Sequence, residues 1–144
     1  MLKIAHRGNL DGSKPELENS PDYIMAAINA GYDVEVDVWF IGKNPYLGHD
    51  RPAYKVDQEF LAGISEKAWF HCKNIDALYA LNKTHYNYFW HQKDSFTLTS
   101  HAFIWTYPGK FVTERSIMVH NGIVELDKLE IIPYGICTDY PDKL

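Results

Sequence analysis

The run Asp-Val-Glu-Val-Asp-Val-Trp at residues 33–39 constrains the fold of this chain more than any other feature. Its apolar and acidic side chains alternate with a period of two, so a β-strand would present the valines on one face and the acids on the other. A solvated edge strand alternates in the same way. Two further apolar runs end in polar residues nearby, Ile-Ala-His-Arg-Gly at 4–8 and Leu-Gly-His-Asp at 47–50. Because the carboxyl ends of parallel strands form the reactive face of a sheet or barrel, this clustering favours a site over a solvated edge.

Size and charge restrict the class of protein. A chain of 144 residues predicts a single domain over 1–144 with a real hydrophobic core. The net charge of −5 argues against a nucleic-acid partner or a polybasic membrane patch, so an anionic substrate would need local positive charge. The apolar runs are too short for a transmembrane segment, and Met1 leads into the first predicted strand without a signal peptide.

The two cysteines, Cys72 and Cys137, are predicted not to form a disulfide. Alternation places Cys72 on the strand face opposite His71 and Lys73, whereas Cys137 shares a face with Asp139. If both polar faces point into a barrel, one thiol points outward and the other inward. Two free thiols are typical of a reducing compartment, and we expect a cytoplasmic protein.

The whole chain predicts about eight short strands and only two clear helices. One helix should begin after Ser20, with Pro21 in its first turn, and another after Asn74. Strands are expected at residues 2–8, 33–41, 46–49, 68–73, 86–91, 103–107, 116–119 and 135–138. This order of elements predicts an α/β fold.

Chain length limits the helical layer of that fold. A complete (β/α)8 barrel usually takes about 250 residues, so several of its helices cannot be present at full length here. We therefore predict a minimal (β/α)8 TIM-type barrel with several outer helices shortened or missing. The aromatic content of 15% could cover strand faces that have lost their helices, with or without a second subunit in a homodimer.

Four groups of residues together resemble the signature of the glycerophosphodiester phosphodiesterase family, within the wider phosphatidylinositol-phospholipase-C-like phosphodiesterases. The groups, in chain order, are His6-Arg7-Gly8, Glu18-Asn19, Glu35-x-Asp37 and His49-Asp50. The resemblance is dense over 4–50, clear at 69–74 and 135–141, and thin between. It implies a metal-dependent hydrolase of a small phosphodiester, glycerophosphodiester-like and so part of lipid metabolism.

His6 and His49 are the candidate catalytic pair. Phosphodiester cleavage needs one group to remove a proton from the attacking oxygen and another to protonate the leaving alkoxide. An imidazole with a pKa near 6.5 suits both roles. A single histidine at a strand end is more often structural, but two of them within matching motifs favour catalysis. The attacking oxygen could belong to water or to a neighbouring hydroxyl of the substrate.

Glu35 and Asp37 are the candidate metal ligands, because alternation directs both carboxylates to one side of a strand. Oxygen ligands favour Mg²⁺ or Ca²⁺. The resemblance implies an acid as the third ligand, but this chain has His71 at that position. An imidazole ligand favours Mn²⁺ or Zn²⁺, so the identity of the divalent ion stays open.

The remaining candidates would bind substrate or support the ligands. Arg7 could hold a phosphate or form a structural ion pair, and Lys73 could bind phosphate. Trp105 could line the substrate pocket or belong to the core. The resemblance implies that Asp139 borders the substrate, and that Glu18, Asn19 and Asp50 support the metal and catalytic residues.

A second hypothesis is a catalytically weak or inactive barrel that binds phosphorylated polyols. Two features motivate it: His71 in place of an acid, and short loops that would leave a shallow site.

Overall fold

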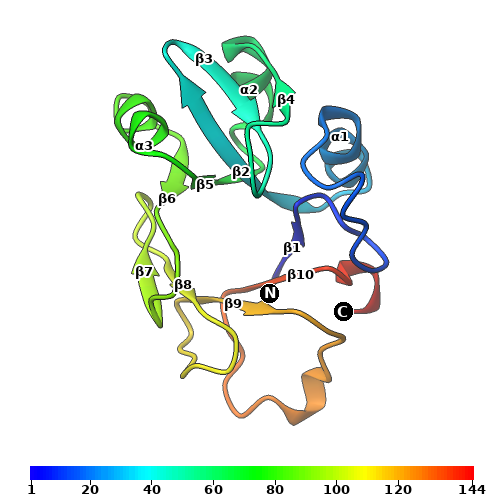
Figure 1. The fold of residues 1–144 in the computed structure, drawn as a ribbon. Coiled ribbons are helices and arrows are strands. Elements are labelled where there is room, and N and C mark those ends of the chain that lie inside the picture. Colours follow the sequence, from blue (N-terminus) through cyan, green and yellow to red (C-terminus); the bar gives the residue numbers. More distant parts are fainter.

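The computed structural model describes residues 1–144 and contains one strongly curled sheet of ten strands with three α-helices on its outside (Figure 1). The strands are β1 (Leu2–His6), β2 (Asp33–Ile41), β3 (Asn44–Leu47), β4 (Tyr54–Lys55), β5 (Ala68–Cys72), β6 (Asn87–Phe89), β7 (Phe96–Leu98), β8 (Ile104–Thr106), β9 (Ser116–His120) and β10 (Gly135–Thr138). The helices are α1 (Pro21–Asn29), α2 (Gln58–Ile64) and α3 (Ile75–Leu81), with short 3-10 turns η1 (Leu126–Lys128) and η2 (Pro141–Lys143).

Seven neighbouring strands run parallel, in the order β6-β5-β2-β1-β10-β9-β8. Their carboxyl ends therefore meet at one mouth of the curled sheet, where loops can bring polar side chains together. The other three strands are antiparallel additions, with β3 paired to β2, β4 to β3 and β7 to β8. Strand β2 is central, and every residue from Asp33 to Val38 is buried, so the solvated-edge interpretation of this run is wrong.

The predicted closed (β/α)8 barrel is also wrong, because the mixed sheet stays open and carries only three α-helices. Residues 46–49 were expected to form the third parallel strand. Instead the chain turns at Gly42, where φ is +61°, and β3 returns antiparallel along β2 as a hairpin. The physical reason is length: the eleven residues between Asp37 and His49 can close a hairpin but cannot cross over to a parallel strand.

The two ends of the parallel segment, β6 and β8, are not joined by a strand ladder, since β7 pairs only with β8. A few hydrogen bonds bridge this seam. The Thr97 hydroxyl donates to the Trp90 carbonyl at 2.9 Å, and the Ser100 amide donates to the Tyr88 carbonyl at 2.8 Å. These isolated hydrogen bonds, one from a side-chain hydroxyl and one from a backbone amide, take the place of the continuous strand pairing that a closed barrel would have.

Local sequence explains the three helices. Pro21 begins α1, where a missing N–H costs nothing. Asp57 and Asn74 cap α2 and α3 by accepting from backbone amides of Phe60 (2.7 Å) and Ala77 (3.0 Å). The Asn74 amide also bonds the backbone of Phe40, which ties the start of α3 to β2. All three helices lie on the β1–β2–β5 side of the sheet (Figure 1).

The core has two main parts, one on each face of the curled sheet. Outside, the helices and β2 and β5 bury a cluster of fifteen apolar residues. Inside, a layer of six fills the middle of the curl: Ile4, Trp69, Phe89, Trp105, Ile117 and Cys137. Polar side chains lie at the two mouths above and below this layer. Cys72 belongs to the outer cluster and Cys137 to the inner layer, which confirms that the two thiols are free and face opposite sides. None of the helices is long and apolar enough to cross a bilayer.

Candidate metal centre

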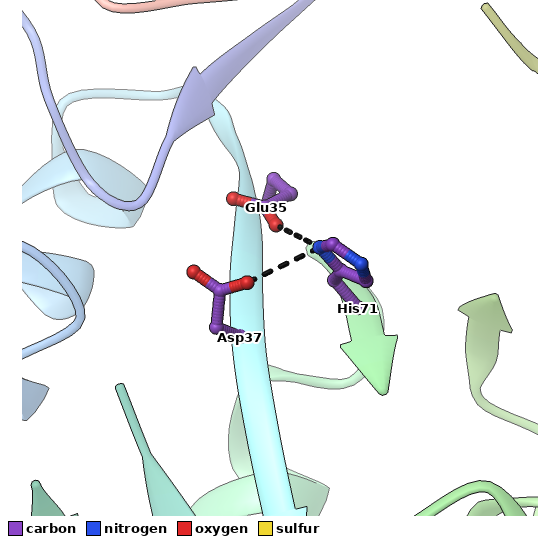
Figure 2. Close-up of side chains that lie close together, drawn as sticks. All are labelled: Glu35, Asp37 and His71. Carbon is purple, nitrogen blue, oxygen red and sulfur yellow. Dashed lines mark ion pairs between the residues drawn. The ribbon is translucent and has the colours of Figure 1, made fainter. Parts of the chain in front are cut away.

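Glu35 and Asp37 on β2 meet His71 on β5 at the carboxyl-end mouth (Figure 2). The parallel register sets Asp37 beside His71, and the period of two directs all three side chains inward. Nδ1 of His71 lies 3.3 Å from Oε1 of Glu35 and 3.1 Å from Oδ1 of Asp37. One donor atom from each residue falls within 4.8 Å of the others. These residues, predicted as ligands, therefore form a compact group that could hold a metal ion.

The orientation of His71 suits a ligand. Its Nε2 donates a hydrogen bond to the His91 carbonyl at 2.7 Å, and its ring stacks on Phe89 at a centroid distance of 5.0 Å. Nδ1 is thereby turned toward the carboxylates, and a backbone carbonyl on the far nitrogen is the usual support of a metal-ligating histidine. Burial lowers the pKa of His71, but its contacts with Asp37 and Glu35 outweigh burial and raise the pKa to about 9. Without a metal, His71 is a cation between two acids.

The two oxygens of Asp37, a residue with no exposed surface, have different surroundings. Oδ2 accepts from Nδ2 of Asn19 at 2.9 Å and from Nδ1 of His49 at 3.3 Å, and Nε of Arg7 lies 3.3 Å away. Oδ1 makes no hydrogen bond of good geometry, although two ion-pair partners lie near it, Nδ1 of His71 at 3.1 Å and Nζ of Lys73 at 3.5 Å. A buried carboxylate oxygen without a hydrogen bond, directed at a second acid and an imidazole nitrogen, fits a divalent cation.

Asp37 stays ionised despite its burial. Burial favours the neutral acid, but the imidazoles of His49 and His71 and the ammonium of Lys73 outweigh that effect and hold the pKa of Asp37 well below its ordinary value. Asn19 holds Asp37 through two hydrogen bonds. Its Nδ2 donates to the carboxylate, and its Oδ1 accepts from the backbone amide of Asp37 at 2.9 Å. The charge of Asp37 is therefore permanent and its orientation fixed.

His6 lies beside this group and is held by Asp139, a contact that the sequence did not predict. Nδ1 of His6 donates to Oδ1 of Asp139 at 2.8 Å, while Nε2 faces Oε2 of Glu35 at 4.0 Å. Burial lowers the pKa of His6, but the hydrogen bond to Asp139 and the charge of Glu35 outweigh burial and raise it. His6 therefore carries its proton more readily than a free histidine does.

His49 lies on the opposite side of Asp37 and, like His6, carries a proton on Nδ1 that faces a carboxylate. Its Nε2 is 3.2 Å from Nη2 of Arg7. A guanidinium can only donate, so Nε2 accepts and the proton sits on Nδ1, facing Asp37. His49 thus presents an unprotonated Nε2 at the mouth, whereas the raised pKa of His6 favours a proton on its Nε2.

Arg7 connects the site to the loop before α1. Its Nη1 donates to Oε2 of Glu18 at 3.0 Å, so the structural ion pair that was one interpretation of Arg7 does exist. Its buried Nε makes no hydrogen bond of good geometry but lies 3.3 Å from Oδ2 of Asp37, so Arg7 pairs with both acids. Arg7 and Asn19 have positive φ angles of +54° and +63°, and Ala102 is the only other non-glycine residue of this kind. Such strain is typical of functional sites.

Asn9 was missed by the sequence analysis. It has no exposed surface, and its Nδ2 donates to Oε1 of Glu18 at 2.9 Å and to Oδ1 of Asp139 at 2.8 Å. Asn9 therefore links Glu18, which pairs with Arg7, to Asp139, which holds His6. The available signal was its position directly after His6-Arg7-Gly8, where a polar residue follows a strand end.

Two predicted site residues lie apart from the others. Asp50 is at the mouth but its side chain is 93% exposed, and its Oδ1 is 3.7 Å from Nε2 of His49. Trp105 is buried in the inner apolar layer, which agrees with the interpretation of it as a core residue. Its ring stacks on Phe89 at 4.3 Å, and Phe89 in turn stacks on His71. Trp105 supports the floor of the site and does not line an open pocket.

A cleft of about 470 Å³ opens beside the site. The residues that line it include Arg7, Glu18 and His49 of the site, together with Arg51 and Tyr54. The cleft is large enough for a small polar molecule.

Comparisons with protein-family models, curated proteins and solved structures found no match.

Proposed function

We propose that this chain is a metal-dependent phosphodiesterase of the glycerophosphodiester type, with His49 as general base and His6 as general acid. The observation that carries the proposal is the inequivalence of the two histidines. Nε2 of His49 accepts from Arg7, whereas His6 has a raised pKa and a hydrogen bond to Asp139. An accepting Nε2 on His49, with a pKa of His6 that is shifted toward the protonated ring at the same mouth, matches the starting state that acid–base cleavage requires.

Arg7, Lys73 and the metal group would bind the phosphate. The guanidinium of Arg7 reaches the mouth beside His49 through Nη2 and matches the geometry of phosphate oxygens. A divalent ion held by Glu35, Asp37 and His71 would polarise a phosphoryl oxygen and offset its charge. The resemblance favours Mg²⁺ or Ca²⁺, and the histidine ligand would also accept Mn²⁺ or Zn²⁺.

The proton movements follow from the hydrogen bonds. Nε2 of His49 takes the proton of the attacking hydroxyl, from water or from the substrate, once a phosphate oxygen replaces it as the partner of Arg7. Asp37 stabilises the resulting imidazolium through Nδ1 at 3.3 Å. Nε2 of His6 gives its proton to the leaving alkoxide, and Asp139 keeps the ring in place through Nδ1.

The test is hydrolysis of glycerophosphocholine by the purified protein with Mg²⁺, Ca²⁺, Mn²⁺ or Zn²⁺, measured by release of choline or glycerol phosphate. We expect His6→Ala and His49→Ala each to lower kcat by about 10²–10⁴-fold. His120→Ala is the matched control, because His120 also ends a parallel strand but contacts none of the site residues and should leave kcat unchanged. No cleavage of any phosphodiester with any of these ions would refute the proposal.

A second candidate is a non-catalytic binder of phosphorylated polyols. One observation favours it: His71, Lys73 and Arg7 already surround Asp37 with positive charge, so the site is neutralised without a metal. Glycerol 3-phosphate binding measured by calorimetry would separate the two. Binding that persists in a His6→Ala/His49→Ala protein, together with no turnover by the wild type, would establish the binder.

A further inference from the structure

The loop that carries His49 is held by β2 through one residue, Gly48. This loop follows β3 and has no regular structure before β4. The Gly48 amide donates to the backbone carbonyl of Asp37 at 3.1 Å, and the Gly48 carbonyl accepts from Nε1 of Trp39 at 2.7 Å. Both backbone polar groups of the residue before His49 are therefore bonded to the strand that carries two of the candidate metal ligands.

No residue other than glycine fits at position 48. Gly48 is buried and its φ is +149°. A Cβ on this residue would collide with the backbone carbonyl of Arg51 and would lie 3.0 Å from the amide nitrogen of Ala53. The rest of the loop thus packs against Gly48 on one side while β2 bonds it on the other, so the backbone before His49 has one position relative to Asp37.

The hydrogen bond of Trp39 lies outside the β2–β3 ladder, which pairs residues 38–41 with 44–47 and ends before Gly48. Alternation places Trp39 on the same face of β2 as Asp37, toward the mouth. At 2.7 Å this bond is shorter than the two that the His49 ring makes, 3.3 Å to Asp37 and 3.2 Å to Arg7. Because hydrogen bonds weaken with length, the backbone of the loop sets where the imidazole lies, and the ring contacts only complete its orientation.

We propose that Trp39 is a positioning residue for His49: its indole holds the Gly48 carbonyl and thereby keeps Nδ1 of His49 on Asp37 and Nε2 on Arg7. A misplacement of about 1 Å can lower the rate of a positioned group about a hundredfold. Without the indole donor, the Gly48 carbonyl loses its partner on β2 and the imidazole leaves Asp37. The effect on catalysis rests on the proposed phosphodiesterase function, whereas the orientation of the ring does not.

The first test observes the His49 ring and needs no turnover. Long-range ¹H–¹⁵N correlation spectra distinguish the two neutral tautomers of a histidine, and His49→Ala identifies the signals of His49. At about pH 8, above the ordinary titration range of histidine, the wild type should show one tautomer with its proton on Nδ1. Trp39→Phe keeps an aromatic ring but removes the donor, so it should show a mixture of both tautomers.

The second test is a double-mutant cycle on glycerophosphocholine hydrolysis. Trp39→Phe should lower kcat at least tenfold and leave KM unchanged. In a His49→Ala protein the same substitution should lower kcat no further, because Trp39 acts through His49. Trp69→Phe is the matched control. It also removes one indole hydrogen bond, to Oδ2 of Asp33 at 3.0 Å, but at the amino end of β2, and it should leave kcat unchanged.

The unfolding temperature of each variant separates a misplaced base from a misfolded chain. Gly48→Ala moves the loop and leaves the indole in place, so it should also mix the tautomers, and it replaces Trp39→Phe if that variant does not fold. The proposal is overturned by a single His49 tautomer in the folded variant, by a mixture in the wild type, or by an equal loss of kcat with and without His49. If no phosphodiester is cleaved, the proposed function fails and the tautomer test alone decides the role of Trp39.

Discussion

The half of the curled sheet around β2 and β5 and the half around β8, β9 and β10 differ in how much of their outer face is covered. Around β2 and β5, the helices help to bury a cluster of fifteen apolar residues, whereas the outer cluster beside β9 and β10 has three. On the second half, Phe96, Leu98 and Phe111 are 48%, 65% and 70% exposed. The metal group and both candidate catalytic histidines belong to the first half. The polar site therefore lies where packing can hold strained and charged side chains in position.

Phe70→Ala should produce the largest effect and would test this difference directly. Phe70 is fully buried in the outer cluster, one residue before His71, so truncation should lower the free energy of unfolding by about 3–5 kcal/mol. Val124→Ala, in the small cluster of the other half, should cost about 1–2 kcal/mol. Urea denaturation measures both. Equal losses would mean that the two halves are equally well packed.

His71→Glu should change the free energy of metal binding, by less than Phe70→Ala changes the free energy of unfolding. A third carboxylate would add an oxygen donor and a negative charge, so Mg²⁺ and Ca²⁺ should bind at least tenfold more tightly, which is about 1.4 kcal/mol. Zn²⁺ should gain less, because it loses an imidazole ligand. Calorimetric titration with all four ions measures this.

His120→Glu is the control for His71→Glu, because it adds the same charge at the end of β9, in the other half. It should leave every affinity unchanged. Unchanged Mg²⁺ and Ca²⁺ affinities in His71→Glu would instead mean that His71 is not a ligand. His71 would then be a phosphate contact beside Lys73.

The effect of Glu18→Gln on the free energy of unfolding should depend on pH, whereas the effect of Glu114→Gln, in the other half, should not. Burial favours the neutral acid, but hydrogen bonds from Ser13, Asn9 and Arg7 outweigh burial and lower the pKa of Glu18. A lowered pKa in the folded state stabilises the protein above the unfolded value of about 4.3, and this contribution is lost as the pH falls through the folded value. Glu18→Gln should therefore cost about 1 kcal/mol at pH 7 and progressively less below pH ~4.

Glu114→Gln is the control for Glu18→Gln, since Glu114 is exposed beside β9. It should change the unfolding free energy little at any pH. A Glu18→Gln difference that is constant from pH 7 to pH 3 would contradict the role given to these hydrogen bonds.

The same two halves explain how much could be predicted from the sequence. In the first half, the bounds predicted for β2 are those observed, and Asn74 caps α3 as predicted, because alternation and capping are local signals. The prediction also brought together Glu35, Asp37 and His71, since strand period fixes which side chains share a face.

The closure of the sheet could not be predicted in the same way. It depends on pairing between distant strands, which no local pattern records. The hairpin at Tyr46, by contrast, follows from chain length, since the eleven residues between Asp37 and His49 are too few for a parallel crossover. Near the seam, the short strand at Phe96 was not among the predicted strands, and its antiparallel pairing with β8 was not foreseen.

Leu98→Ser should have the smallest effect and would show whether the uncovered half has a partner. In an isolated chain Leu98 is 65% exposed, so the substitution should change the unfolding free energy by less than about 0.5 kcal/mol. If a second subunit covers this face, the wild type should instead sediment as a dimer and its unfolding midpoint should rise with protein concentration. Leu98→Ser would then weaken the dimer, whereas Tyr79→Ser, 65% exposed on α3 in the other half, would not. Monomeric sedimentation of the wild type at all concentrations would rule out the homodimer and leave the exposed aromatic residues as a property of the single chain.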